Sequence, residues 1–127
     1  MERAIVAIPS TTPAGLEAPR SQHFGRAEYF IVVRVEQGSI THVRAVANQP
    51  EPTAGHGSIA RALIDEGLTD IITSGMGAGM YARAVSAQVG VWIDQDSCTV
   101  GESMASFLSG SLVAATEADI HAEHHTA

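Results

Sequence analysis

The feature that most constrains the fold of this chain is a set of short apolar runs spread along its length. Ala4–Ile8 is apolar at every position and stops at Pro9, which is the pattern of a β-strand buried on both faces. The short runs Asp70–Thr73 and Val91–Ile93 also predict strands much later in the chain. Helix-like segments separate these later strands, so the sequence predicts an α/β domain.

The remaining elements follow from periodicity and from turn residues. Two alternating segments with a short glycine-containing connection between them predict an antiparallel hairpin. Apolar stripes ending at glycines predict three helices, and the third begins with capping-box spacing. The predicted elements are strands at 4–8, 29–35, 39–47, 70–73 and 91–93, helices at 58–66 and 80–89, and a helix from Thr99 to Gly110. This order gives a five-stranded mixed sheet flanked by helices.

Length and composition limit the domain organisation. The chain has 127 residues, of which 45% are hydrophobic, enough for one core, and we expect a single domain at 1–115 followed by an acidic, histidine-containing tail at 116–127 that is disordered. A net charge of -7 argues against broad binding to nucleic acid or to anionic membranes. No apolar run approaches the roughly 20 residues of a spanning helix, and no leader pattern is visible, so we expect a cytoplasmic protein.

Chain direction brings several loops to one end of the predicted sheet. If the first strand rises, the second descends, the third rises again, and the two later strands rise parallel to the first. His23 before the second strand, His56 after the third and Cys98 after the fifth should therefore share one rim, together with the glycines at 75–79. Open α/β sheets usually bind ligands beyond the carboxyl ends of their parallel strands.

Three side chains at this rim are candidate metal ligands. His23 can ligate through one ring nitrogen, or it is a loop histidine that only caps or packs against Phe24. His56 has glycine on both sides and so has a freely rotating backbone, although glycine pairs also mark ordinary turns. Cys98 precedes a predicted helix amino end, which favours a thiolate, although lone cysteines are often inert core residues. It has no internal disulfide partner, since it is the single cysteine.

An anionic ligand has its own candidate contacts. Arg26 can pair with an anion if its side chain turns to the rim. Gly75, Gly77 and Gly79 can let backbone amides approach a phosphate at the start of the second helix. Their GxGxG spacing is not a dinucleotide fingerprint, because Met80 stands where the third glycine would be. Tight helix–strand packing is the structural alternative for these glycines.

Catalysis is poorly supported by the sequence. No Ser-His-Asp arrangement can be assigned, and the first predicted strand supplies no carboxylates for the metal ions of a nuclease. His42 lies on a strand beside Ile40 and Arg44 and receives no functional role. The histidines of the tail, His121, His124 and His125, are assigned to its disordered end.

Several of these segments together resemble a known family. Ser21-Gln-His-Phe-Gly-Arg-Ala-Glu-Tyr-Phe30 is the most specific of them. With Ala7-Ile-Pro-Ser10, Gly55-His-Gly57, the glycines at 75–79 and Gly90-Val91, the chain resembles the dinitrogenase iron-molybdenum cofactor biosynthesis family over about residues 3–110. This family includes the NifX-like proteins and the domain at the end of NifB.

The resemblance implies a ribonuclease H-like fold and non-catalytic binding or transfer of iron-sulfur cofactor precursors for nitrogen fixation. By motif match it assigns ligand roles to His23 and His56, while Cys98 is added from topology alone. We therefore expect a cytoplasmic carrier of an iron-sulfur or iron-molybdenum-type cluster, with cluster-donor and cluster-acceptor proteins as partners. A homodimer is a further expectation, because the edge strand at 39–47 invites pairing.

Two other classes of function stay open at this point. The chain could be an enzyme or regulatory module that binds a phosphate or nucleotide at Gly75–Gly79. It could also be an interaction domain with no ligand.

Overall fold

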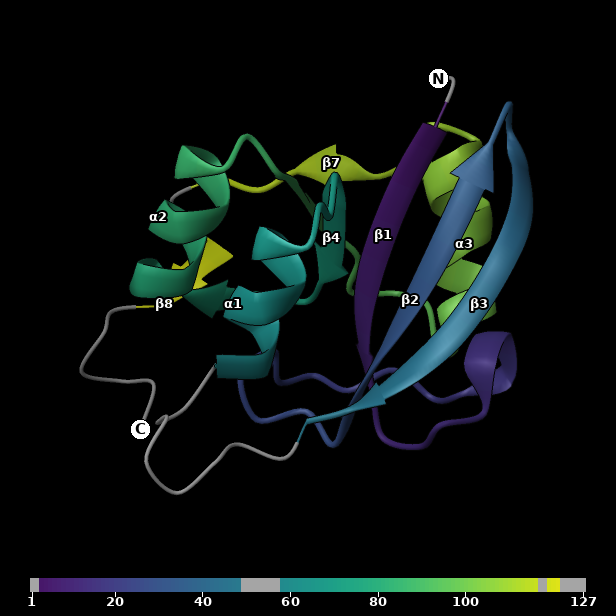
Figure 1. Cartoon of the computed structure of the whole chain (residues 1–127), viewed down its shortest axis with the longest axis horizontal. Coiled ribbons are helices and arrows are strands. Elements are labelled where there is room, and N and C mark those ends of the chain that lie inside the picture. Colours follow the sequence, from purple (N-terminus) through teal and green to yellow (C-terminus); the bar gives the residue numbers. More distant parts are fainter. Residues whose placement is uncertain (1–2, 49–57, 117–118, 122–127) are drawn as a thin grey trace.

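The computed structural model describes residues 3–48, 58–116 and 119–121, which form an α/β arrangement around a twisted mixed sheet (Figure 1). The main sheet has six strands in the order β3-β2-β1-β4-β6-β7. They are β1 (Arg3–Ser10), β2 (Tyr29–Glu36), β3 (Ser39–Ala47), β4 (Asp70–Thr73), β6 (Gly90–Ile93) and β7 (Val113–Ala114). β1, β4 and β6 are parallel, while β2 is antiparallel to both β1 and β3, as the sequence predicted.

The predicted strand count of five is wrong, because β7 pairs antiparallel with β6 and adds a sixth strand. A separate two-stranded sheet joins β5 (Met76–Gly77) to β8 (Ile120–His121). Strands of two residues carry no readable alternation, so only their pairing partners reveal them. β8 lies within the segment that was assigned to the tail, and residues 122–127 lie outside the described part of the chain. The domain boundary at 115 and the ribonuclease H-like classification stay predictions.

The three α-helices lie close to their predicted positions. They are α1 (Ser58–Asp65), α2 (Ala78–Ser86) and α3 (Val100–Leu108). The short 3₁₀ helix η1 (Gly15–Glu17) was not predicted. α2 begins two residues before the predicted start at 80 and ends before 89. Gly67 follows α1 with a φ of 113°, which confirms its predicted role as a left-handed stop.

Two hydrophobic clusters cover the two faces of the sheet. Ala4, Val6 and Ile8 of β1 pack with Val100, Met104 and Phe107 of α3 on one face. The alternate β1 residues Ile5 and Ala7 pack with α1 and α2 on the other face. The period of two in a strand produces this division, which is why Ala4–Ile8 is apolar without interruption. β1 and β4 are therefore packed between α1 and α2 on one face of the sheet and α3 on the other. This packing holds the loops that follow β1 and β4 in place.

A tight hairpin and a bulge shape the outer strands. Gln37 and Gly38 both have positive φ, 53° and 81°, as a two-residue type I′ turn requires. The pairing of β2 with β3 shifts register after Arg34, which pairs with His42, while Val35 pairs with Ile40. Thr41 is the extra residue of this β-bulge. None of the described helices is long and apolar enough to cross a bilayer.

Candidate cofactor-binding rim

The loops after β1, β4 and β6 meet at one end of the sheet, as strand direction predicted. We call this surface the rim and define it as residues 11–28, 74–75 and 94–99. The Arg20 N–H donates to the carbonyl of Cys98 at 2.9 Å, and Ser21 N–H donates to the carbonyl of Pro9. Pro19 forms an antiparallel bridge with Thr99. The long loop after β1 therefore folds back and runs alongside the loop that enters α3.

Arg20 joins all three loops of the rim through its side chain. One terminal nitrogen, Nη2, donates to Ser74 Oγ at 2.8 Å, and the other, Nη1, donates to the Ser97 carbonyl at 3.2 Å. Nη1 also lies 3.6 Å from Oδ1 of Asp94, and both side chains are only 4% exposed. The Arg20 Nε is buried without a hydrogen-bond partner among the described residues. Burial lowers the pKa of Arg20, while the attraction of Asp94 and Cys98 opposes that shift.

Asp94 is held by a set of hydrogen bonds from the same loop and from α3. Its Oδ1 accepts from the main-chain N–H groups of Asp96 and Ser97 at 3.1 and 3.0 Å, and its Oδ2 accepts from Ser103 Oγ at 2.9 Å. Burial by itself would raise the pKa of Asp94, but the hydrogen bonds from Ser97, Ser103 and Asp96 outweigh it and lower the pKa. Asp94 is therefore a charged structural anchor of this loop.

His23 lies on a loop that is held by contacts on either side of it. Its imidazole is exposed, while the following Phe24 is 5% exposed and packs against Phe30 with ring centroids 5.1 Å apart. The main-chain N–H of His23 donates to Ser21 Oγ at 3.1 Å. Asn48, which follows β3, donates from Nδ2 to the carbonyls of Gly25 and Ala27 at 3.1 and 2.7 Å. The side chain of this segment that packs into the core is Phe24, which contacts Phe30.

Cys98 is an exposed free thiol at the amino end of α3. Its N–H donates to Glu102 Oε1 at 2.7 Å. Thr99 is the N-cap of α3 and forms with Glu102 the predicted capping box. The main-chain N–H of Arg20 donates to the carbonyl of Cys98, and Arg20 lies three residues before His23 in the chain. Arg20 therefore links the two segments that carry the exposed potential ligands. The loops that carry His23 and Cys98 therefore lie side by side.

The predicted glycine loop is used largely for structure. Gly75 is buried, its N–H donates to Thr73 Oγ1 at 3.4 Å, and the Thr73 hydroxyl donates to the Gly75 carbonyl at 2.8 Å. Gly77 pairs with His121 in the β5–β8 sheet and is the N-cap of α2. Gly79 is exposed within the first turn of the helix. These contacts favour helix–strand packing as the role of Gly75 and Gly77.

Arg26 and His56 are the remaining predicted contacts of a ligand. Arg26 is exposed on the loop that carries His23. His56 lies outside the described residues. Within 3–48, 58–116 and 119–121, no group of three or more His, Cys, Asp or Glu side chains is arranged to hold a metal ion.

Most of this chain matches the model of a known protein family. The family model described as dinitrogenase iron-molybdenum cofactor matches residues 2–110. The chain belongs to this family. The match spans the rim and every strand of the main sheet except β7, and it confirms the resemblance that was found in the sequence motifs.

Several solved structures share the fold of this chain. A Thermotoga protein whose description names NifB is 31% identical, with 87% of this chain and 92% of that chain covered and a TM-score of 0.71. The apo form of the orange protein from Desulfovibrio gigas is 27% identical, with 91% and 94% covered and a TM-score of 0.74. A Methanocaldococcus jannaschii protein, 18% identical with 91% and 98% covered and a TM-score of 0.71, shares the fold. No curated protein matches the chain.

Sequence reasoning missed the residues that hold the rim together within this family fold. Arg20, Asp94 and Ser103 belong to three segments that only the folded chain brings into contact. The one local signal was the length of the loop after β1, which is typical of a functional segment. That signal points to the loop and does not point to Arg20.

Proposed function

We propose that this protein is a non-catalytic carrier that holds an anionic iron-sulfur or iron-molybdenum-type cluster at the rim and passes it to a partner protein. The cluster is the cargo and not a resident cofactor. The observation that carries this proposal is the contact between the Arg20 main chain and Cys98, which sets the His23 loop beside the Cys98 loop. Membership of the iron-molybdenum cofactor family supports the choice of cargo.

The chemistry of the exposed side chains fits such a cargo. A thiolate and an imidazole are both suitable ligands for iron, and His23 and Cys98 are both exposed. His56 is proposed as a third ligand from the sequence motif. Few protein ligands leave positions of the cluster open for exchange, unlike the four-ligand closure of a structural zinc site. Arg26 would offset part of the negative charge of the cluster.

The fixed geometry of the two loops favours binding of the cluster. Phe24 and Asn48 hold the loop around His23, and Asp94 holds the loop before Cys98. The ligands therefore do not have to be ordered when the cluster binds, which lowers the entropic cost of loading. The relative from Desulfovibrio gigas was solved in an apo form, which supports a protein that folds without its ligand. Proteins that donate and accept the cluster are the proposed partners.

Anaerobic reconstitution with ferrous iron and sulfide, with and without tetrathiomolybdate, tests this function. Visible absorption and bound metal are measured for the wild type and for the His23→Ala, His56→Ala and Cys98→Ala variants. We expect each substitution to reduce uptake and the His23→Ala/His56→Ala pair to abolish it. His42→Ala is the matched control, because His42 is an exposed histidine on β3 outside the rim.

Unchanged metal uptake in the double histidine variant would reject the proposed ligands. Equal loss in His42→Ala would indicate nonspecific metal binding to exposed histidines. If Cys98→Ala alone takes up the cluster as the wild type does, the thiol is removed from the ligand set and the carrier proposal rests on the two histidines.

A further inference from the structure

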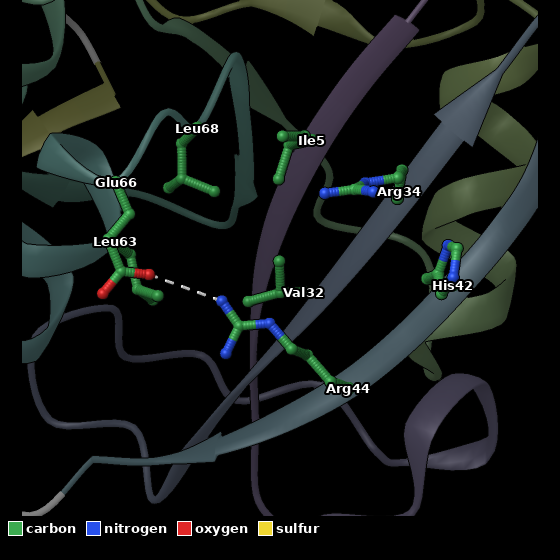
Figure 2. Close-up of a pocket in the computed structure, with 8 residues that line it drawn as sticks. All are labelled: Ile5, Val32, Arg34, His42, Arg44, Leu63, Glu66 and Leu68. Atoms are coloured by element: carbon green, nitrogen blue, oxygen red, sulfur yellow. Dashed lines mark ion pairs between the residues drawn. The ribbon is translucent and has the colours of Figure 1, made fainter.

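A hollow lies away from the rim, between the strands β2 and β3 and the end of α1 (Figure 2). Its volume is about 330 Å³, at the lower end of the range for small-molecule pockets. Apolar side chains of Ile5, Val32, Leu63 and Leu68 form part of its wall. Leu68 follows Gly67, whose positive φ turns the chain back toward the sheet after α1.

Three basic side chains, Arg34, His42 and Arg44, line the same hollow. Arg34 and Arg44 share a face of the sheet with Val32. Arg34 is two residues after Val32 on β2, and Arg44 is the residue of β3 that pairs with Val32. The chain has seven Lys and Arg residues and a net charge of -7 with histidine counted as neutral, so two arginines against one glutamate around a hollow are a local excess of positive charge.

The bulge at Thr41 brings His42 into this group. Ile40 packs with the α3-side cluster, on the opposite face of the sheet from Val32. In a regular strand Ile40 and His42 would share a face. Because Thr41 is an extra residue opposite Arg34, His42 instead pairs with Arg34 on the α1 side. Its Nδ1 contacts Thr41 Oγ1 at 3.2 Å, so Nε2 is the ring nitrogen left for a ligand.

The positive charge around the hollow is only partly balanced. Arg44 Nη2 lies 3.5 Å from Glu66 Oε1, and the two side chains are 57% and 63% exposed. An exposed pair of this kind is weak and readily exchanged. Across residues 3–48, 58–116 and 119–121, Arg20, Arg44 and Arg83 have ion-pair partners, whereas Arg34 has none.

We propose that this hollow is a binding site for a small organic anion with an apolar body, such as an aromatic or medium-chain carboxylate free in solution. The apolar body would contact Val32, Leu63 and Leu68, and the anionic group would bind Arg34 and displace Glu66 from Arg44. Guanidinium groups bind carboxylates through paired hydrogen bonds, which suits two arginines on neighbouring strands. The proposal does not depend on the cluster-carrier function, because none of these residues belongs to the rim.

Titration of the full chain with 8-anilinonaphthalene-1-sulfonate, followed by its fluorescence, tests this site. The uncharged N-phenyl-1-naphthylamine is the matched probe, since it keeps the aromatic body and lacks the sulfonate. We expect saturable binding of the sulfonate, about tenfold weaker in Arg34→Gln and in Arg44→Gln through loss of a charge-assisted hydrogen bond. Glu66→Gln should bind severalfold more tightly, because it frees Arg44 and removes a negative charge.

Arg61→Gln is the control variant, because it makes the same change of charge at an exposed α1 residue outside the hollow. Its affinity should stay within about twofold of the wild type, as a screened distant charge predicts. Absence of saturable sulfonate binding, an equal loss in Arg61→Gln, or equally tight binding of the uncharged probe would overturn the proposal. Loss of structure would expose apolar surface and raise the binding of both probes. A gain in Glu66→Gln that is confined to the sulfonate therefore supports the site, whereas an equal gain with the uncharged probe contradicts it.

Discussion

Nη1 of Arg20 lies 3.6 Å from Oδ1 of Asp94, and each of these two side chains is 4% exposed. The pair lies where the loops after β1, β4 and β6 meet. Arg20 bonds outward to Ser74 and Ser97, and Asp94 bonds to Ser103 of α3. A buried charge at the centre of such a network is costly to leave unpaired, so the pair should control both the stability and the geometry of the rim.

Asp94→Ala should lower the free energy of unfolding by about 3 kcal/mol, because it leaves Arg20 buried without a counter-charge and removes three acceptor contacts. Urea denaturation followed by far-UV circular dichroism measures this change. Asp96→Ala is the control, since its side chain is exposed in the same loop. A loss of under about 1 kcal/mol in Asp94→Ala would contradict the assigned anchoring role.

Acidification should remove the contribution of Asp94. Its folded-state pKa is lowered, so its stabilisation is complete above the unfolded value of about 3.9 and is lost as pH falls through the folded pKa. We expect the difference in unfolding free energy between the wild type and Asp94→Asn to be constant from about pH 5 to 7 and to shrink below about pH 4. Denaturation series at each pH measure it. A difference that grows on acidification would show that the sign is wrong.

Thr99→Ala should cost about 1 kcal/mol of unfolding free energy, because α3 loses the side-chain acceptor for the Glu102 N–H. Thr99→Ser keeps the hydroxyl and should recover most of that loss. The comparison is made by urea denaturation of both variants. If the two variants lose equal stability, packing of the threonine methyl group, and not capping, is the contribution of this residue.

Phe24→Ala should destabilise the protein by about 3 kcal/mol, because the ring is buried against Phe30. Phe24→Leu should cost less, since it keeps most of the apolar volume. Thermal or urea unfolding measures the loss, and amide hydrogen exchange reports on the loop at 21–28. Faster exchange confined to that loop is expected in Phe24→Ala, whereas unchanged exchange would separate Phe24 from the positioning of His23.

Part of the candidate site could be predicted from sequence, and part could not. Strand direction brought the loops with His23 and Cys98 to one end, because parallel strands share their carboxyl edge. Arg20 could not be selected from the sequence, because it belongs to no local pattern. A regular strand would place His42 on the same face as Ile40, and the bulge at Thr41 reverses that relation.

The sequence by itself determined the elements that depend on near neighbours. Apolar runs set the strands, the positive-φ pair Gln37-Gly38 set the hairpin, and Thr99 with Glu102 set the start of α3. Tertiary structure alone decided the contacts between distant segments: the Arg20–Asp94 pair, the two-residue strands, and the basic hollow beside α1. Local rules act over a few residues, whereas burial, ion pairing and strand register depend on which distant surfaces the folded core brings together.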